Sequence, residues 1–157
     1  MSHDTTSQTL KNLEAAFAGE SMAHTKYLYF AKICRQHGDE ATARVFEETA
    51  AQEVIHALGH ADLLYPSASM TPEKCLQMAI EGETHEYTEM YPAFRHAAVA
   101  EGNSAAVAEI DEQIEESREH AEMFRKTLTM AEKRFAALTR VEEKHARNYQ
   151  TILDNLK

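Results

Sequence analysis

The sequence is poor in the residues that interrupt helices and in the cysteines that build small metal modules. Its 157 residues include five Gly, three Pro, two Cys and no Trp. Cys34 and Cys75 stand far apart and form no C-x-x-C pair, which excludes a rubredoxin-type or zinc-ribbon module from this sequence. No window approaches 18 uncharged apolar residues, so a transmembrane helix is not expected.

Basic charge is also scarce. The sequence has 16 Lys and Arg residues and 26 Asp and Glu residues, which gives a net charge of −10 at pH 7. This balance argues against binding to nucleic acid or to an anionic membrane, because both need a basic surface. No secretory signal is visible at the N-terminus, so we expect a cytoplasmic protein. The length suits one domain with its own core, which we expect to span residues 1–157.

The few Gly and Pro residues divide the chain into helical segments. Between them the sequence is rich in good helix formers and lacks the alternation typical of strands. Gly38 and Gly102 suit the position just after a helix, while Thr71 and Pro72 suit the start of one. The sequence therefore predicts an all-α fold, an antiparallel four-helix bundle. Its helices are expected at about 6–37, 39–65, 72–101 and 103–156.

Pro92 falls inside the third predicted helix. A proline there removes one backbone hydrogen bond and crowds the preceding turn. We therefore expect a kink or bulge one turn upstream, near Thr88. Bulges of this kind are frequent beside functional sites.

Glutamates on core-facing stripes indicate a metal site. Glu20, Glu53 and Glu86 fall near mid-height of the first three predicted helices. Apolar residues three, four and seven positions away share the stripes of Glu20 and Glu53, so these two carboxylates face the core. Several buried acids at one level are tolerated only when cations neutralise them.

Histidines complete a recognisable ligand set. Glu53-x-x-His56 and Glu142-x-x-His145 each place a carboxylate and an imidazole on one helix face, and Glu83 precedes Glu86 by one turn. Two Glu-x-x-His pairs, with glutamates from two further helices, form the dimetal carboxylate site of a bundle core. Carboxylates stabilise Fe²⁺ and Fe³⁺ and can bridge two ions. The sequence therefore predicts two iron ions, with zinc or manganese as substitutes.

Five segments resemble the rubrerythrins, and they occur in the same order: AFAGES, KYLYFA, FEETAAQEVIHA, GETHEYTEMYPAF and RFAALTRVEEKHARNY. The resemblance covers nearly the whole chain. It implies a ferritin-like bundle with a non-haem diiron centre that reduces hydrogen peroxide to water. The iron ligands that it implies are Glu20, Glu53, His56, Glu83, Glu86, Glu142 and His145.

The resemblance also implies roles in turnover. Tyr27 and Tyr91 match tyrosines that support the site, and one iron is expected to exchange His56 for Glu83 between redox states. Because the sequence has no rubredoxin cysteines, electrons must come from a separate rubredoxin-like protein or a flavoprotein. Two other functions stay open: a ferritin-like iron-binding, ferroxidase or storage protein, and a scaffold whose metal site is purely structural.

The last predicted helix is longer than the family pattern expects. About 25 extra residues lie between Gly102 and Phe135. An apolar seam with steps of three and four runs unbroken from Val107 to Leu156, as in a coiled coil. Such an insertion keeps the facing of Glu142 and His145 but moves them roughly 37 Å along the helix.

Three arrangements of this helix remain open. In the first arrangement, the helix runs on unbroken and places residues 131–157 in the bundle of a partner, which makes a domain-swapped homodimer. Alternatively, it folds back near 127–129, where Thr129-x-x-Glu132 is a capping box. In the third arrangement, Glu116 and His120 replace the last ligand pair. The residue of the last helix at the height of the other ligands is Ser117, which is not a carboxylate, and Glu116 and His120 lie close to it. The unbroken seam favours the swap.

Overall fold

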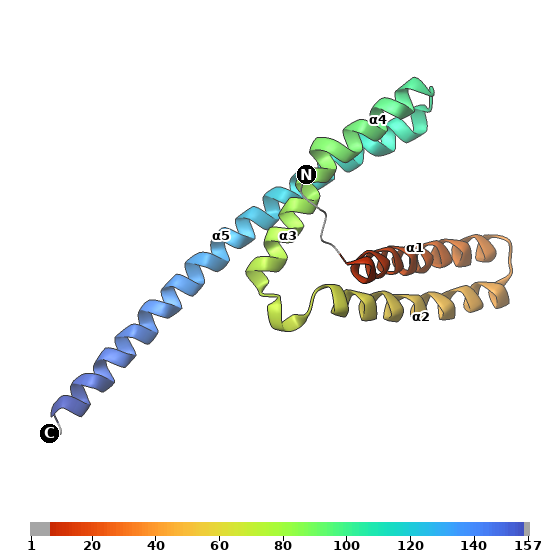
Figure 1. Ribbon diagram of the computed structural model, residues 1–157. Coiled ribbons are helices and arrows are strands. Elements are labelled where there is room, and N and C mark those ends of the chain that lie inside the picture. Colours follow the sequence, from red (N-terminus) through yellow and green to blue (C-terminus); the bar gives the residue numbers. More distant parts are fainter. Residues whose placement is uncertain (1–6, 156–157) are drawn as a thin grey trace. The chain divides into compact units, whose positions relative to one another are not determined.

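The structure is a computed structural model that describes residues 7–155, apart from the side chain of Phe135. Every element in this range is helical, which confirms the all-α prediction (Figure 1). The chain divides into two compact units, Met1–Met70 and Thr71–Lys157, and each is considered by itself. Among the described residues, none of the helices combines the length and the apolar character needed to cross a membrane.

The first unit is a hairpin of α1 (Gln8–Gln36) and α2 (Glu40–Leu64), followed by the short 3-10 helix η1 (Ser67–Ser69). Gly38 makes the turn between α1 and α2 with a φ of 79°, a conformation that costs glycine little. Asp39 then caps α2 by accepting a hydrogen bond from the Thr42 amide at 3.0 Å. A turn this short makes the two helices antiparallel.

Small residues bring α1 and α2 together. Ala43, Ala50 and Ala57 recur every seventh position of α2 and are buried, as is Ala31 of α1. Alanine side chains at this contact let the helix backbones approach closely. The hairpin therefore holds its two helices in a fixed register, and this register sets the height of the side chains that α1 and α2 share.

Aromatic rings and ion pairs stabilise the end of the hairpin near the turn. The ring of Phe46 lies 5.8 Å from that of Tyr27 and 5.5 Å from that of Phe30, measured between centroids. Arg35 donates to Glu40 at 3.0 Å and to Glu47 at 2.7 Å. These hydrogen bonds lower the pKa of both carboxyl groups.

The second unit packs an interrupted helix against a long one. The interrupted helix consists of α3 (Pro72–His85), the π-helical turn η2 (Glu86–Met90) and α4 (Tyr91–Ala100). It begins with the expected cap, because the Thr71 hydroxyl accepts from the Lys74 amide at 3.2 Å. The π turn ends at Met90, two residues before Pro92, which confirms the predicted bulge near Thr88.

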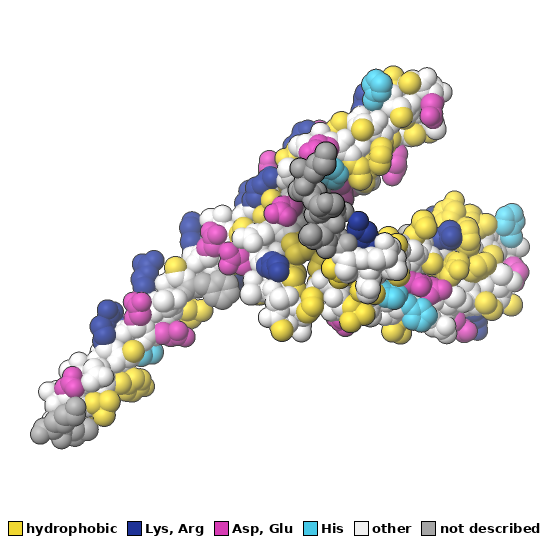
Figure 2. Space-filling model, in the orientation of Figure 1, with side chains coloured by type: hydrophobic (Ala, Val, Ile, Leu, Met, Phe, Trp, Pro, Cys, Tyr) yellow, Lys and Arg dark blue, Asp and Glu magenta, His cyan; other side chains and the backbone are white. Residues whose placement is uncertain are grey.

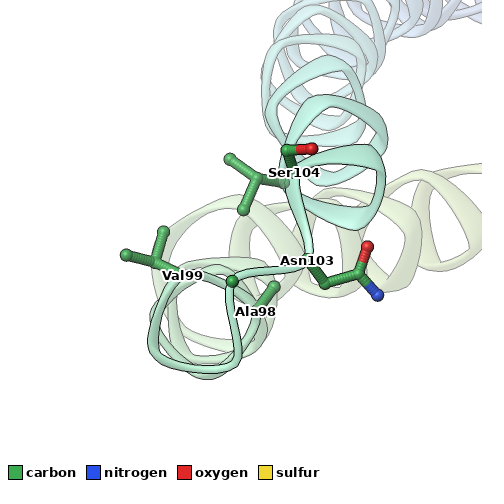
Figure 3. Close-up of a pocket in the computed structure, with 6 residues that line it drawn as sticks. Ala98, Val99, Asn103 and Ser104 are labelled. Carbon is green, nitrogen blue, oxygen red and sulfur yellow. The ribbon is translucent and has the colours of Figure 1, made fainter.

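A tight turn connects α4 to α5 (Ser104–Asn155). Gly102 has a φ of 70°, and the Asn103 side chain accepts from the Ala106 amide at 3.1 Å. Ala98, Val99, Asn103 and Ser104 surround a small hollow at this turn (Figure 3). The turn fixes the register between α4 and the first half of α5.

Helix α5 runs without interruption from Ser104 to Asn155. The hydroxyls of Thr127 and Thr129 donate to carbonyl oxygens four residues earlier, as they do inside a continuous helix. The predicted fold-back near 127–129 is therefore wrong. Hydrophobic side chains remain exposed along the second half of α5 (Figure 2), namely Leu138, Val141, Tyr149, Ile152 and Leu153. The domain swap stays a prediction.

Candidate metal centre

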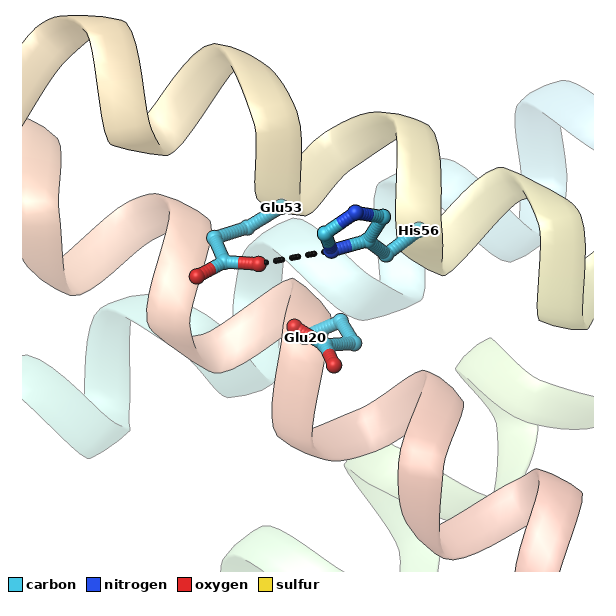
Figure 4. A group of neighbouring side chains, drawn as sticks. All are labelled: Glu20, Glu53 and His56. Carbon is cyan, nitrogen blue, oxygen red and sulfur yellow. Dashed lines mark hydrogen bonds and ion pairs between the residues drawn. The ribbon is translucent and has the colours of Figure 1, made fainter.

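Three of the expected ligands meet on the α1–α2 hairpin. Glu20 comes from α1, and Glu53 and His56 come from neighbouring turns of α2 (Figure 4). One potential ligand atom of each residue lies within 4.8 Å of the other two. The i, i+3 spacing places Glu53 and His56 on one face of α2, and the alanine contacts bring that face to the height of Glu20.

The surroundings of these residues suit a cation. The Glu53 side chain is only 17% exposed, and its carboxylate accepts a hydrogen bond from His56 Nδ1 at 2.9 Å. Two partly buried carboxylates this close repel one another, and one imidazole proton offsets only part of that repulsion. Carboxylate oxygens and an imidazole nitrogen are donors that iron, zinc and manganese accept. The residues present therefore fit a metal ion.

His24 links the two helices beside this group. Its Nδ1 lies 2.8 Å from the carbonyl oxygen of Ala50, so the imidazole ties α1 to α2. The contact lies one turn after Glu20 and one turn before Glu53. His24 stands outside the motifs that the sequence presents, and its four-residue spacing from Glu20 is the signal that could have found it.

A second acidic group lies between η2, the end of α3 and α5. His120 Nδ1 is 3.5 Å from Glu83 Oε1, and the Ser117 hydroxyl donates to Glu86 Oε2 at 3.0 Å. The Glu83 side chain is 22% exposed, and Ser117 is buried, with only 4% of its surface exposed. The structure thus places Ser117 and His120 of α5 opposite the two glutamates.

The two expected tyrosines lie in different surroundings. Burial raises the pKa of Tyr91, and the negative charges of Glu86 and Glu83 raise it further. Its phenol therefore keeps its proton and remains a hydrogen-bond donor beside those carboxylates. Tyr27 is half-buried in the aromatic cluster with Phe30 and Phe46.

The remaining expected ligands lie elsewhere on α5. Glu142 and His145 are both exposed. Glu142 follows His120 by 22 residues on one unbroken helix, which corresponds to about 33 Å of rise. Within the second unit, therefore, the structure does not bring Glu142 and His145 to Glu83 and Glu86. Glu116, the other candidate beside His120, is exposed.

Comparison with known proteins decides the family. The sequence model of the rubrerythrins matches residues 11–128. The chain belongs to the rubrerythrin family. Nigerythrin of Nitratidesulfovibrio vulgaris is 45% identical over 112 residues, covering 63% of this chain and 55% of nigerythrin. A rubrerythrin of Porphyromonas gingivalis is 32% identical over 162 residues, covering 96% of this chain and 68% of that protein.

Solved structures of nigerythrin are also similar in sequence. The fully reduced, all-ferrous state is 35% identical and covers 84% of this chain and 73% of that chain, with a TM-score of 0.41. The chain thus spans little more than half the length of the curated nigerythrin. The rubrerythrin match confirms the predicted family and its ferritin-like fold class. The match ends at residue 128, so it contains Ser117 and His120 but not Glu142 and His145.

Proposed function

We propose that this rubrerythrin relative is a diiron peroxidase, which reduces hydrogen peroxide to water with electrons from a separate protein. One observation carries the proposal: Glu20, Glu53 and His56 present their ligand atoms within 4.8 Å of one another on the hairpin, in a chain of the rubrerythrin family. Exposed charged residues can lie side by side on a single helix. A metal site, in contrast, needs ligands from neighbouring helices that converge on one point.

The proposed ligands form two groups, and each group lies within one unit. Glu20, Glu53 and His56 come from the hairpin, and Glu83 and Glu86 come from α3 and η2. For the last helix, the contact between His120 and Glu83 supports His120, while Glu142 and His145 are the alternative that the resemblance implies. Zinc or manganese can bind the same oxygen and nitrogen donors.

Two iron ions, when bound, would supply the two electrons that, with two protons, convert one hydrogen peroxide into two waters. The chain itself supplies charge balance and proton handling. The carboxylates offset the charge of the cations. Tyr91 holds a proton on its phenolic oxygen beside Glu83 and Glu86, because burial and those carboxylates raise its pKa. It can therefore donate a hydrogen bond to the oxygen that accumulates negative charge during cleavage of the O–O bond.

The proposed reaction needs an electron donor. We propose a rubredoxin-like protein or a flavoprotein as the donor, and a homodimer as the assembled form. The exposed apolar side chains on the second half of α5 support the homodimer, because a second copy would cover them.

Anaerobic stopped-flow kinetics tests the proposal. The iron-loaded, reduced protein is mixed with hydrogen peroxide or with dioxygen, and reoxidation is followed by absorbance. We expect peroxide to react much faster, with one peroxide consumed for each pair of electrons. Glu53→Gln should abolish the fast reaction, and Glu14→Gln, an exposed position on α1, should leave it unchanged. Reoxidation by dioxygen alone, with deposition of iron, would instead identify a ferroxidase or storage protein.

A further inference from the structure

The second half of α5 has no cover within the second unit. Ala131 is the last described residue of α5 that is buried, and every described side chain from 132 to 155 is exposed. The match to the rubrerythrin family ends close by, at residue 128. Helices in proteins gain most of their stability from packing one face against a partner. The segment 132–155 has to find that packing elsewhere.

This segment carries one apolar face with a polar pair in its middle. Leu138, Tyr149 and Ile152 lie on that face and are exposed (Figure 2). Glu142 and His145 occupy the two seam positions between Leu138 and Tyr149. In a coiled coil these positions face the partner helix. The partner must therefore offset a carboxylate and an imidazole in the middle of an apolar contact.

A second copy of the same segment meets this requirement when it runs antiparallel. A two-fold axis between residues 143 and 144 places Glu142 opposite the partner's His145, and His145 opposite the partner's Glu142. The same axis places Leu138 opposite the partner's Tyr149. Apolar side chains then meet on both sides of two adjacent carboxylate–imidazole pairs. The seam thus matches its own reverse.

Other partners fit this face less well. A parallel second copy would place Glu142 opposite the same glutamate of the partner, and like charges across a contact cost free energy. A membrane surface would have to take up the Glu142 carboxylate in the middle of the apolar face, which is also costly. The four positions that flank the middle of the seam are uncharged and do not repel a second copy: Thr139, Val141, Ala146 and Asn148.

We propose that residues 132–155 of two copies pair as an antiparallel coiled coil, with a two-fold axis between residues 143 and 144. The paired length is about 36 Å, or roughly three heptads. This inference rests on the homodimer of the proposed function, and it adds the contact face, the orientation and the register. It differs from the domain swap, in which the same segment completes the bundle of a partner. Glu142 and His145 then pair across the dimer and are not iron ligands.

Disulfide cross-linking of the full-length chain tests the orientation. Under mild oxidation, the double variant Leu138→Cys with Tyr149→Cys should form a cross-linked dimer, because the two positions face each other across the axis. In either single variant, the two equal positions lie roughly 16 Å apart along the helices, too far for a disulfide. The wild type measures the background from Cys34 and Cys75, and peptide mapping locates each bond.

Cross-links in both single variants would overturn the inference in favour of a parallel pair. A double variant without cross-links between its new cysteines would overturn it too, because a domain swap or another partner for this face predicts that result. A wild type that sediments as a monomer would refute the proposed homodimer as well. The peroxide kinetics of the reduced protein test the proposed reaction separately.

Charge exchange tests the register independently. Glu142→Lys should weaken dimerisation by roughly 10-fold or more, measured by analytical ultracentrifugation, because it replaces the carboxylate that faces His145 with a cation. Adding His145→Glu should restore the dimer, since each introduced amine then faces an introduced carboxylate. Glu143→Lys makes the same charge change one position outside the seam and is the matched control, with little effect expected. Equal dimerisation of Glu142→Lys and Glu143→Lys would overturn the register, as would failure of the double variant to recover.

Discussion

Replacing Glu20 by glutamine should change stability in opposite directions with and without metal. The ligand oxygens of Glu20 and Glu53 lie within 4.8 Å of each other, so the metal-free hairpin holds two like charges close together. At that separation, two unit charges repel by about 1 kcal/mol at the dielectric constant of water and by about 3.5 kcal/mol at an effective value of 20.

In the metal-free protein, Glu20→Gln removes this repulsion and keeps the shape of the side chain. We therefore expect its free energy of unfolding to rise by about 1 kcal/mol. With metal at a hundred times the dissociation constant, the wild type gains about 2.7 kcal/mol. A variant whose affinity is 100-fold weaker keeps only about 0.4 kcal/mol of that gain. The order of stability of the two proteins then reverses.

Urea denaturation, once with a chelator and once with a fixed concentration of Zn²⁺, measures both free energies. Glu14→Gln, at an exposed position of the same helix, is the matched control and should shift either value by less than about 0.5 kcal/mol. The reasoning is refuted if Glu20→Gln destabilises the metal-free protein. It is refuted equally if the variant gains as much from Zn²⁺ as the wild type does.

Three further results are expected from the hairpin. Ala50→Leu places a large side chain at a fully buried helix contact and should cost about 1–3 kcal/mol of unfolding free energy, whereas the exposed Ala51→Leu should cost less than about 0.5 kcal/mol. His24→Ala removes the hydrogen bond to Ala50 and should cost about 0.5–1.5 kcal/mol, measured by urea denaturation. Arg35 lowers the pKa of Glu47 in the folded chain. The ion pair therefore stabilises the fold at neutral pH, and this stabilisation is lost as pH falls through the lowered pKa. Between neutral and acidic pH, the denaturation midpoint should fall less steeply in Glu47→Gln than in the wild type.

The helix ends and the hairpin site were predictable because their signals are local. Gly38 and Gly102 adopt the positive φ that their positions at helix ends require, and Thr71 caps α3 as expected. The bulge near Thr88 follows from one missing amide at Pro92. Glu53 and His56 are fixed by helical spacing alone, and Glu20 needed only the assumption of an antiparallel neighbour.

The fourth helix was harder to interpret because its register depends on tertiary contacts. The apolar seam of α5 repeats every three or four residues, so many positions along it fit against the same partner surface. Glu142-x-x-His145 matches the ligand motif in sequence, yet the residues that face Glu83 and Glu86 are His120 and Ser117. A serine carries no metal-binding signal in a sequence. Its contact with Glu86 places Ser117 beside the carboxylates of α3 and η2.

Iron content is the most direct test of the central claim that this chain holds a diiron centre. The protein is isolated from iron-replete cells without chelators, and its metals and protein are quantified in the same folded sample by elemental analysis. The account predicts two metal ions per chain, predominantly iron, and removal of the metal with a chelator should lower the unfolding midpoint. A folded, untreated sample with no bound iron, zinc or manganese would contradict the claim.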